Sequence, residues 1–407
     1  MKCGLLGEKL SHSYSPAIHA MLADYDYRLY EKSPGELADF ILRGGWDGLN
    51  VTIPYKKAVI PYCTELSGAA RRCSSVNTLL RLPGGGIRGE NTDADGFSYL
   101  LCSIGFDPAG KKAVVFGSGG ASATVRAVLE ERGAAEIVTV SRSGQDNYEN
   151  LSRHVDAQLV VNATPVGMYP RNGVCVCSLA PFESCEAAAD LIYNPARSAF
   201  LLQAEALGIP HANGLGMLVA QAKRSAELFL QKPIPDGEVG RIERTLAREM
   251  RNVVLVGMPG CGKSTIGKLL AAAMGRELRE TDALVAEAAG ISIPEIFRRG
   301  GEAEFRALET ETLRAVGKLS GAVIATGGGC VTREENYPLL HQNAVIVWLQ
   351  RELGKLPKDG RPLSLSGDLE EMYARRRPLY ERFCDFSVSN DGTPDQTVRA
   401  ILDAIGP

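Results

Sequence analysis

Eight consecutive residues near the middle of the 407-residue chain have the types and spacing that bind nucleotide phosphates. They read Gly257-Met-Pro-Gly-Cys-Gly262-Lys263-Ser264 and match the pattern GxxxxGK[ST] throughout. Glycines let backbone N–H groups converge on phosphate oxygens at a helix N-terminus, which favours anions. Lys263 would then reach the β and γ phosphates of ATP, and Ser264 would ligate Mg²⁺. The expected ATP contacts are Gly257, Gly260, Cys261, Gly262, Lys263, Ser264 and Thr265.

A second glycine-rich turn reads Gly117-Ser-Gly119-Gly120-Ala-Ser122. It has glycine at the first two glycine positions of the dinucleotide-binding fingerprint and serine at the third. Enzymes that use NAD place an acidic residue at the end of the next strand, where this chain has Ser141-Arg142-Ser143. Since a guanidinium can bind a 2′-phosphate, NADP is the expected cofactor. The turn by itself also suits another phosphate or ribose site.

Short polar side chains in the first 230 or so residues could line a pocket for a hydroxylated carboxylic acid. Ser13 and Ser15 carry hydroxyls that suit a carboxylate, and other side chains can both donate to and accept from ring hydroxyls. The latter are Asn50, Thr52, Asn77 and Gln221. Lys56 and Asp93 are the ionisable pair. By residue type alone, they suit either proton transfer to a new alkoxide or a surface salt bridge.

Strands and helices must bring these residues together. Along almost the whole chain, short apolar runs that are typical of strands alternate with helical patterns. Continuous apolar runs are expected where both faces of a sheet are buried, so the alternation predicts parallel sheets covered by helices. The clearest strands are Ala113–Gly117, Glu136–Val140, Leu159–Ala163, Val253–Gly257, Ala322–Thr326 and Ala344–Leu349. A helix follows each glycine-rich turn, and we expect Gly133 and Gly275 to end these two helices.

The composition disfavours several classes of protein. A net charge of −3 gives no electrostatic reason to expect nucleic acid or a membrane surface, and no apolar run reaches the ~18–20 residues of a membrane span. The ten cysteines include no CxxC pair, which argues against a zinc site or a disulfide framework and predicts reduced, mostly buried thiols. The N-terminal segment lacks the apolar core of a signal peptide. We expect a cytoplasmic protein with small-molecule partners, and the oligomeric state stays open.

Further motifs follow the phosphate-binding turn and narrow the interpretation. They are Thr281-Asp282, Ile293–Phe297, Gly301–Glu309, Thr326–Gly329, Gly360–Leu363 and Arg375–Tyr380. Together they resemble shikimate kinase over essentially all of Met250–Pro407. The resemblance implies that Asp282 orients or deprotonates the attacking hydroxyl and that the Arg361 guanidinium closes a lid. It implies substrate contacts by Asp282, Arg306, Gly327, Gly328, Gly329 and Arg376, the arginines binding a carboxylate.

A second ordered set of motifs occupies the first part of the chain. They are Ser11–Pro16, Asn50–Lys56, Val76–Thr78, Asn91–Asp93, Asn162–Pro165, Asp190–Pro195 and Asn213–Gln221. Together they resemble shikimate dehydrogenase from Met1 to about Leu230. The resemblance implies that Lys56 is the general acid/base of a ketone reduction and that Asp93 is its partner.

The same resemblance assigns two sets of binding residues. The substrate set is Ser13, Ser15, Asn50, Thr52, Lys56, Asn77, Asp93, Tyr193 and Gln221. The NADP set is Gly117, Ser118, Gly119, Gly120, Ala121, Ser141, Arg142, Ser143, Thr164 and Gly214. The chain departs from the families at Ser74-Ser75, where Gly-Ala is preferred, and at Glu280, where Asp is usual. The segments Ser143–Gln158 and Gln350–Arg361 look short.

The predicted fold is α/β, with a substrate domain, a Rossmann-type NADP domain and a P-loop kinase domain. We expect residues 1–100 in the first, completed by about 215–240, and residues 101–214 in the second. Residues 231–250 would be a linker or terminal helix before the kinase domain at 251–407. The resemblances imply NADPH-dependent reduction of 3-dehydroshikimate, then ATP-dependent phosphorylation of shikimate. A quinate or shikimate dehydrogenase fused to a small-polyol kinase, or one half that binds ligand without catalysis, stays an open alternative.

Overall fold

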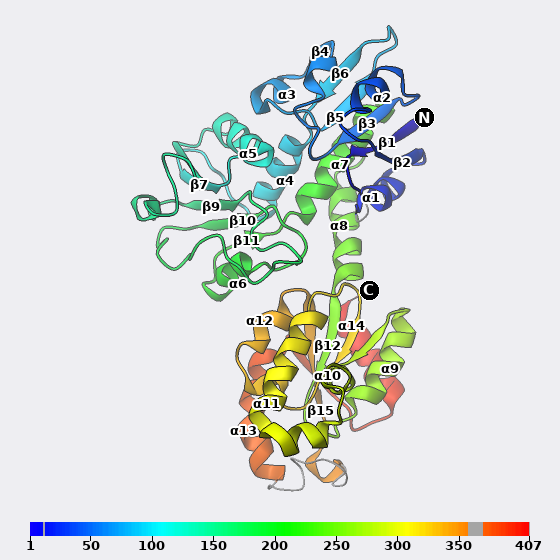
Figure 1. The fold of residues 1–407 in the computed structure, drawn as a ribbon, viewed down its shortest axis with the longest axis vertical. Coiled ribbons are helices and arrows are strands. Elements are labelled where there is room, and N and C mark those ends of the chain that lie inside the picture. The colour runs from blue at the N-terminus through cyan, green and yellow to red at the C-terminus, as the bar shows by residue number, and fades with distance from the viewer. Residues whose placement is uncertain (11–12, 357–368, 407) are drawn as a thin grey trace. The chain divides into compact units, whose positions relative to one another are not determined.

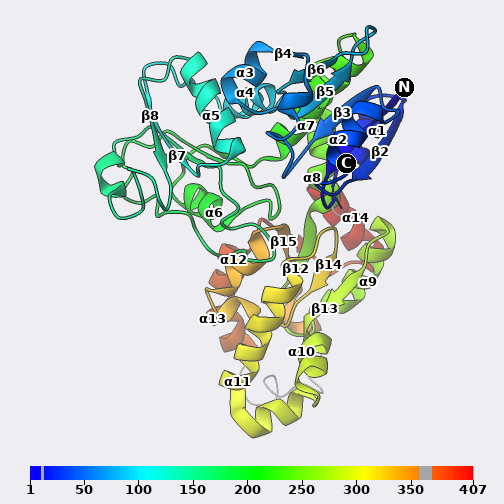
Figure 2. The ribbon, with the colours of Figure 1, turned by 45° about the horizontal axis from the view of Figure 1, so that its top comes forward.

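The protein forms two compact units in a computed structural model that describes residues 1–10, 13–356 and 369–406. The first unit contains Met1–Tyr193 and Ser198–Leu246, and the second contains Asn194–Arg197 and Ala247–Pro407. Figure 1 and Figure 2 show that each unit has its own strands and helices. Within the described ranges, no helix combines the length and apolarity needed to cross a bilayer.

The first unit begins with a six-stranded mixed sheet. Its strands are β1 (Lys2–Gly7), β2 (Asp26–Glu31), β3 (Gly48–Val51), β4 (Glu65–Leu66), β5 (Thr78–Arg81) and β6 (Ile87–Glu90), in the order β2-β1-β3-β5-β6-β4. β1 is parallel to β2 and β3, and β4 is parallel to β6. β5 is antiparallel to both β3 and β6. The expectation of parallel sheets is therefore wrong for the β5–β6 hairpin.

A glycine-rich turn, Pro83-Gly84-Gly85-Gly86, explains this antiparallel pair. Gly85 has φ +84°, in the left-handed region that favours glycine. The Leu82 N–H donates to the Gly86 carbonyl at 2.8 Å, and the Gly85 N–H donates to the Leu82 carbonyl at 2.9 Å. Parallel strands need a crossover of about a dozen residues or more, so a turn this short can join only antiparallel neighbours.

The helices α4 (Asp93–Ser103) and α7 (Leu215–Leu230) of the first unit pack closely because a glycine, which has no side chain, lies at their contact. Gly96 on α4 lies against α7, and a Cβ atom there would come within 2.6 Å of the Met217 carbonyl oxygen. The last helix, α8, buries Val239, Ile242 and Leu246 in a cluster with residues of α7. The helices are α1 (Ser15–Leu22), α2 (Leu37–Arg43), α3 (Gly68–Cys73), α4 (Asp93–Ser103), α5 (Gly120–Glu131), α6 (Ala199–Ala206), α7 (Leu215–Leu230) and α8 (Gly237–Met250), with 3-10 turns η1 (Ile60–Tyr62) and η2 (Leu151–His154).

The second sheet of this unit is wholly parallel, as expected for continuous apolar strands. Its strands are β7 (Lys112–Phe116), β8 (Glu136–Val140), β9 (Leu159–Asn162), β10 (Ala187–Asp190) and β11 (His211–Ala212), in the order β11-β10-β9-β7-β8. Alternate side chains of β7 enter two cores. Val115 packs with residues of α4 and α5, and Val114 and Phe116 pack with residues of α6. Both faces of the sheet are thus covered by helices.

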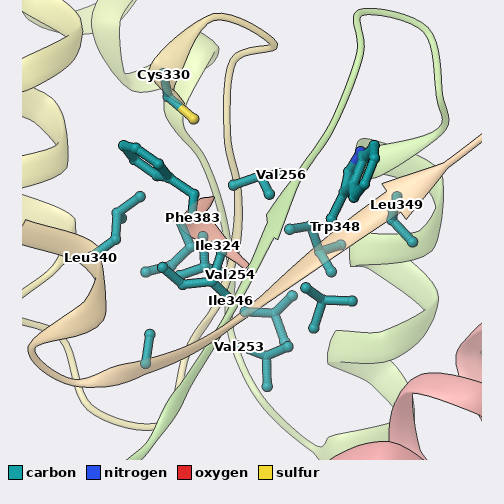
Figure 3. Close-up of a cluster of buried hydrophobic side chains, with 14 of the residues drawn as sticks. Val253, Val254, Val256, Ile324, Cys330, Leu340, Ile346, Trp348, Leu349 and Phe383 are labelled. Atoms are coloured by element: carbon teal, nitrogen blue, oxygen red, sulfur yellow. The ribbon is translucent and has the colours of Figure 1, made fainter. Parts of the chain in front are cut away.

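The second unit is built around a parallel sheet of five strands. They are β12 (Asn252–Val256), β13 (Leu278–Glu280), β14 (Val323–Ala325), β15 (Ala344–Gln350) and β16 (Phe386–Ser389), in the order β13-β14-β12-β15-β16. Figure 3 shows Val254, Ile324 and Ile346 from the three central strands in one buried cluster with Leu340 and Phe383. This apolar core fixes the strand ends from which the second site is built.

Six helices and two 3-10 turns complete the described part of the second unit. They are α9 (Lys263–Met274), α10 (Thr281–Ala289), α11 (Ile293–Val316), α12 (Asn336–His341), α13 (Leu369–Phe383), α14 (Pro394–Ile405), η3 (Cys330–Thr332) and η4 (Leu353–Lys355). Gly275 caps α9 with φ +63°, and in the first unit Gly133 follows α5 with φ +78°, as expected. α10 and α11 pack side by side through Val285, Ile296 and Phe305, and Figure 2 shows them beside the sheet.

Candidate active sites

The phosphate-binding turn of the second unit begins where β12 ends. Gly257 has φ +147°, and a Cβ atom there would lie 2.5 Å from the Leu349 carbonyl oxygen at the end of the neighbouring β15. Gly262 has φ +101°, and a Cβ atom there would meet the Asn390 side chain at 2.5 Å. Asn390 in turn donates to the Cys261 carbonyl at 2.7 Å. The turn is therefore held in one conformation that only glycine accepts at both positions.

Lys263 is the first residue of α9 and folds back over this turn. Its Nζ donates to the Gly257 carbonyl at 2.8 Å and to the Met258 carbonyl at 3.0 Å, and the side chain is buried. Ser264 and Thr265, the next two residues, are exposed. An ammonium group, two hydroxyls and a helix N-terminus thus meet at one place, which suits a polyphosphate.

A cavity of about 780 Å³ opens from this turn and contains most of the residues predicted for the second site. Among its lining residues are Gly260, Gly262, Lys263, Ser264, Thr265, Asp282, Arg306, Gly327, Gly328, Gly329 and Arg376. Gly257 and Cys261 do not line it, and Cys261 is fully buried beneath the turn. Arg361 lies outside the described residues.

The cavity also contains residues that the sequence did not single out. Arg351 and Lys355 follow β15 and line the same wall. Neither residue sits in a glycine-rich motif, and isolated basic residues in a loop carry no pattern that separates them from surface charges. Glu309 also lines the cavity, and it is the last residue of the motif Gly301–Glu309, so the sequence could have predicted it as a site residue.

Charged side chains are paired at the closed end of this cavity. Arg306 is buried and donates from Nη1 to Glu309 at 2.7 Å, and its Nε and Nη2 atoms donate to Glu302 Oε1 at 3.2 and 3.0 Å. Burial alone would lower the pKa of Arg306, but Glu309 and Glu302 raise it overall. Burial raises the pKa of Glu309 despite Arg306 beside it. Arg376, also buried, donates to the Gly328 carbonyl at 3.2 Å.

Three consecutive glycines let these charged groups approach the backbone. A Cβ atom on Gly327 would lie 2.5 Å from Glu309 Oε1 and 2.6 Å from Asp282 Oδ1. A Cβ atom on Gly329 would lie 2.1 Å from Arg306 Nη2. The carboxylates of Asp282 and Glu309 and the guanidinium of Arg306 therefore converge on one short stretch of chain after β14.

The glycine-rich turn of the first unit, Gly117–Ser122, joins a strand to a helix as the phosphate-binding turn of the second unit does. Gly117 directly follows β7 and has φ +111°, and a Cβ atom there would lie 3.0 Å from the Ala163 carbonyl oxygen. Gly119 and Gly120 begin α5 with open space around them, since no atom lies within 4 Å of a Cβ on Gly119. Ser118 and Ala121 are exposed on the same turn. The geometry leaves the N-terminus of α5 accessible to a pyrophosphate.

The other residues predicted to contact NADP lie next to the ends of strands and helices in this unit. Thr164 follows β9 and donates its hydroxyl to Asn162 at 2.7 Å. Gly214 begins α7, where a Cβ atom would lie 2.1 Å from the Leu191 carbonyl oxygen. Arg142, between Ser141 and Ser143 at the end of β8, is exposed and has no hydrogen bond or ion pair to any described residue. Residues 141–158, all described, contain η2 and no α-helix, which agrees with the short segment predicted there.

Lys56 and Asp93 form an ion pair in the first unit. Lys56 Nζ lies 2.6 Å from Asp93 Oδ2, with the lysine side chain 27% exposed and the aspartate 13%. Asp93 begins α4, and the Lys56 carbonyl accepts a hydrogen bond from the Val76 N–H at 2.8 Å. The pair is therefore held from both sides and remains partly open to a ligand.

A buried hydrogen-bond network lies beside this pair and includes two predicted substrate residues. The Asn77 side chain donates to Thr92 Oγ1 at 3.0 Å and accepts from the Thr92 N–H at 2.7 Å. Gln221 accepts from Thr92 at 3.5 Å. Ser225, which sequence analysis missed, lies within 3.0 Å of Thr92 Oγ1 and 2.9 Å of Thr78 Oγ1, and donates to the Gln221 carbonyl at 3.0 Å.

Asn50 belongs to the same network. It accepts from the Tyr27 hydroxyl at 2.8 Å and donates to Ser225 at 2.7 Å and Thr78 at 3.2 Å. Both of its N–H groups are thus used inside the protein, and the residue is buried. Because residue type shows what a side chain can donate or accept, but not where it points, the sequence could not reveal this.

The remaining predicted substrate residues surround the start of α1. Ser15 is buried at the first position of this helix, and its N–H donates to the Ser13 hydroxyl at 3.2 Å. Thr52 follows β3 and donates its N–H to the Leu6 carbonyl at 2.9 Å. Tyr193 packs edge-on against Tyr14 with ring centroids 6.0 Å apart, and burial raises its pKa.

Comparison with known families identifies both parts of the chain. The shikimate kinase family model matches residues 259–406, and the model of the shikimate dehydrogenase substrate binding domain matches residues 5–79. Shikimate dehydrogenase (NADP(+)) from Methanopyrus kandleri is 36% identical over 266 residues, which cover 57% of this chain and 91% of that protein.

Solved structures agree with the sequence comparison. A chorismate mutase/shikimate 5-dehydrogenase fusion protein from Clostridium acetobutylicum has a TM-score of 0.57 and 34% identity, covering 60% of this chain and 96% of that one. Shikimate 5-dehydrogenase from Thermus thermophilus, in complex with NADP(H) and shikimate, has a TM-score of 0.55 and 29% identity, covering 60% of this chain and 99% of that one.

Replacing Ser225 by alanine should destabilise the region around the Lys56–Asp93 pair. The change leaves a buried Asn50 N–H without a partner, which costs about 1–3 kcal/mol. We expect hydrogen–deuterium exchange of α4 and α7 in the full chain to show a free energy of opening lowered by about that amount. Ser103→Ala is the matched control, because the Ser103 hydroxyl also donates to a helix carbonyl, at 2.7 Å, but is exposed. An equal effect of both changes would contradict the role of the network.

Replacing Gly328 by alanine should displace the phosphate-binding turn. A Cβ atom there would lie 2.7 Å from Pro259 Cδ and 2.8 Å from its backbone nitrogen, so the turn must move. Since overpacking costs about 1–3 kcal/mol, we expect ATP affinity, measured by titration calorimetry, to fall roughly ten-fold. Gly354→Ala is the control, because Gly354 lines the same cavity and a Cβ there meets no atom within 4 Å. Unchanged affinity in Gly328→Ala would contradict the expectation.

Proposed function

The chain belongs to the shikimate dehydrogenase family and carries a shikimate kinase domain, and from this identity we propose which residues perform its two reactions. The protein is a bifunctional enzyme of aromatic amino acid biosynthesis. Its first unit reduces 3-dehydroshikimate to shikimate with NADPH, and its second unit phosphorylates shikimate with ATP. The product of the first reaction is thus the substrate of the second.

In the first unit, Lys56 is the proposed general acid/base. NADPH supplies a hydride to the ketone carbon, and the ketone oxygen must then receive a proton. The Lys56 ammonium donates that proton, and Asp93 at 2.6 Å holds the ammonium in place. This short, partly exposed ion pair is the observation that carries the proposal. Because the pair is half enclosed, it exchanges protons with solvent between turnovers.

Neutral donors and acceptors recognise the substrate around this pair. Ser13 and Ser15 are proposed to bind the carboxylate, and Thr52, Asn77, Tyr193 and Gln221 the rest of the ring acid. The network around Ser225 orients Asn77 and Gln221, since each of them bonds to Thr92. Asn50 is proposed to position this network and not to contact the substrate, because its N–H groups already have partners.

The NADP site uses the open N-terminus of α5. The backbone N–H groups at Gly119, Gly120 and Ala121 are proposed to face the pyrophosphate. Arg142 is proposed to bind the 2′-phosphate, because its guanidinium is exposed and unpaired among the described residues. The remaining contacts come from Gly117, Ser118, Ser141, Ser143, Thr164 and Gly214.

In the second unit, Asp282 is proposed to orient and deprotonate the hydroxyl that attacks ATP, and Lys263 to neutralise charge on the transferred phosphoryl group. Arg306 and Arg376 bind the substrate carboxylate in this proposal. Glu302 holds the Nε/Nη2 edge of Arg306 through one oxygen, and its side chain is 52% exposed. This edge can therefore be released to a ligand carboxylate, whereas the buried Glu309 keeps the opposite edge fixed.

The donor groups near the turn fit Mg²⁺ held mostly by the nucleotide. Among the described residues, no group of three or more His, Cys, Asp or Glu side chains could hold a metal ion. Mg²⁺ usually takes one or two protein ligands together with phosphate oxygens and water, so Ser264 on the exposed start of α9 is a sufficient protein ligand. When bound, the ion neutralises charge on the phosphates. Glu280, just before α10, is proposed to act on it through water.

The free cysteines bear on the cellular compartment that we propose for the enzyme. All ten cysteines are free, although only Cys3, Cys73, Cys261 and Cys330 are buried, so the expectation of mostly buried thiols is wrong. A chain with ten unpaired thiols suits a reducing compartment. We therefore propose that the enzyme works in the cytoplasm.

The two activities should be separable by single substitutions. Lys56→Ala removes the proton donor of the first site, so we expect kcat for NADPH oxidation with 3-dehydroshikimate to fall by about 10²–10⁴-fold. Phosphorylation of shikimate by the same preparation should be unchanged. Lys263→Ala should have the reverse effect. Both rates are measured on each purified full-length variant, and loss of both activities from either single change would contradict the assignment.

Removal of Mg²⁺ should stop only the second reaction. We expect EDTA to abolish phosphorylation of shikimate and excess Mg²⁺ to restore it, because the ion neutralises phosphate charge in the transition state. NADPH oxidation with 3-dehydroshikimate should continue at its original rate in EDTA. Ser264→Ala should raise the Mg²⁺ concentration needed for half-maximal phosphorylation. An unchanged requirement in this variant would remove Ser264 from the metal site.

A further inference from the structure

The loop between β8 and η2 is braced by its own hydrogen bonds. The Ser141 N–H donates to the Asp146 carbonyl at 3.1 Å, and Asp146 Oδ1 lies 2.9 Å from His154 Nε2. The Asn147 N–H donates to Asn150 Oδ1 at 2.8 Å, and Asn150 Nδ2 donates to the Gln145 carbonyl at 2.9 Å. These bonds fix the backbone on both sides of Tyr148, the residue that the loop presents.

Tyr148 is an exposed aromatic residue beside the dinucleotide turn. Its ring stacks on Phe116, with centroids 5.9 Å apart and planes at 26°. Phe116 is the last residue of β7 and directly precedes Gly117. Although one part of the Tyr148 ring covers Phe116, the residue remains 41% exposed. An aromatic surface is therefore held open at the carboxyl end of the parallel sheet, where dinucleotides bind.

Arg142 lies in the same loop, next to Ser141, whose N–H bonds to the Asp146 carbonyl two residues before Tyr148, so the closed loop brings Arg142 and Tyr148 to the same end. Burial raises the pKa of the Tyr148 hydroxyl, and the nearby Arg142 guanidinium opposes that rise. Arg142 has no hydrogen bond or ion pair within the described part of the chain. An unpaired guanidinium and an exposed aromatic ring thus stand together at the ends of β7 and β8. An adenosine 2′-phosphate offers one partner for each, a dianionic phosphate and a flat base.

We propose that Tyr148 forms part of the adenine site of the dehydrogenase, with its ring against the base of NADP while Arg142 binds the 2′-phosphate. This inference rests on the proposed NADP site and extends it to the base. Stacking of a base on an aromatic ring uses only the flat face of the base. Its strength therefore does not depend on whether the ligand carries a 2′-phosphate. Tyr148 therefore contributes affinity that NADP and NAD share, whereas Arg142 contributes the preference between them.

The test separates these two contributions by binding and by kinetics. NADPH and NADH are each titrated into full-length Tyr148→Ala, Tyr148→Phe, Tyr148→Leu and Arg142→Ala, with nicotinamide fluorescence as the binding readout. KM for each cofactor is measured with saturating 3-dehydroshikimate. Phosphorylation of shikimate by the same samples reports that the second unit is folded, and kcat for NADPH oxidation at saturating cofactor and 3-dehydroshikimate reports that the first unit is folded. The Phe variant keeps the ring, and the Leu variant keeps an apolar side chain without one.

We expect Tyr148→Ala and Tyr148→Leu to weaken NADPH and NADH binding by a similar factor, about ten-fold, since both changes remove the ring on which the base stacks. Tyr148→Phe should bind both cofactors like the unchanged chain. Arg142→Ala should weaken NADPH binding alone. A loss confined to NADPH in Tyr148→Ala would mean that Tyr148 only positions Arg142, and unchanged binding of both cofactors would mean that the ring does not touch the base. Either result overturns the proposal.

Failure of the proposed function gives a different result. If the unchanged chain binds NADPH but does not oxidise it with 3-dehydroshikimate, the catalytic assignment fails while the binding comparison still decides the role of Tyr148. If the unchanged chain binds neither cofactor, both the NADP site and the adenine site are overturned.

Discussion

Both active sites depend on a strand that ends in a glycine pressed against the carbonyl group at the end of a neighbouring strand. Gly117 has φ +111° and leaves 3.0 Å for a Cβ before the Ala163 carbonyl oxygen. Gly257 has φ +147° and leaves 2.5 Å before that of Leu349. In each case the backbone conformation disfavours a side chain, and the neighbouring strand leaves little room at Gly117 and none at Gly257. The chain can therefore turn at once into α5 or α9, and a helix N-terminus of this kind favours an anion such as phosphate.

This constraint explains which features could be predicted from the sequence. The strands around both turns are continuous apolar runs, and the glycines between strand and helix have a fixed spacing, so pattern and turn chemistry agree there. The β5–β6 hairpin was missed although its signal is present, because Pro83-Gly84-Gly85-Gly86 is a typical tight turn. The contacts of Asn50, Ser225 and Tyr148 could not be predicted, since they depend on which way a side chain points after distant segments pack together.

The charged pairs of the two sites differ in how far they are buried. The Lys56–Asp93 pair keeps part of its surface in solvent, with the lysine side chain 27% exposed and the aspartate side chain 13% exposed. At the closed end of the kinase cavity, Glu309 is fully buried and Arg306 nearly so. A buried carboxylate and guanidinium must stay paired, which makes Arg306 a fixed positive group and not a proton donor.

The pairing of Arg306 also determines how the kinase cavity can accept a carboxylate without exposing an unpaired charge. Its Nη1 atom stays with the buried Glu309 at 2.7 Å, and its other edge is held by the half-exposed Glu302 at 3.0 Å. Glu302 is 52% exposed, so water can solvate its carboxylate when it leaves, whereas the buried guanidinium of Arg306 needs a replacement partner. A ligand carboxylate that replaces it can use both N–H groups of that edge, whereas Glu302 offers them a single oxygen. The guanidinium is therefore oriented and paired in the ligand-free chain, and in the proposed site the substrate carboxylate would take the place of Glu302.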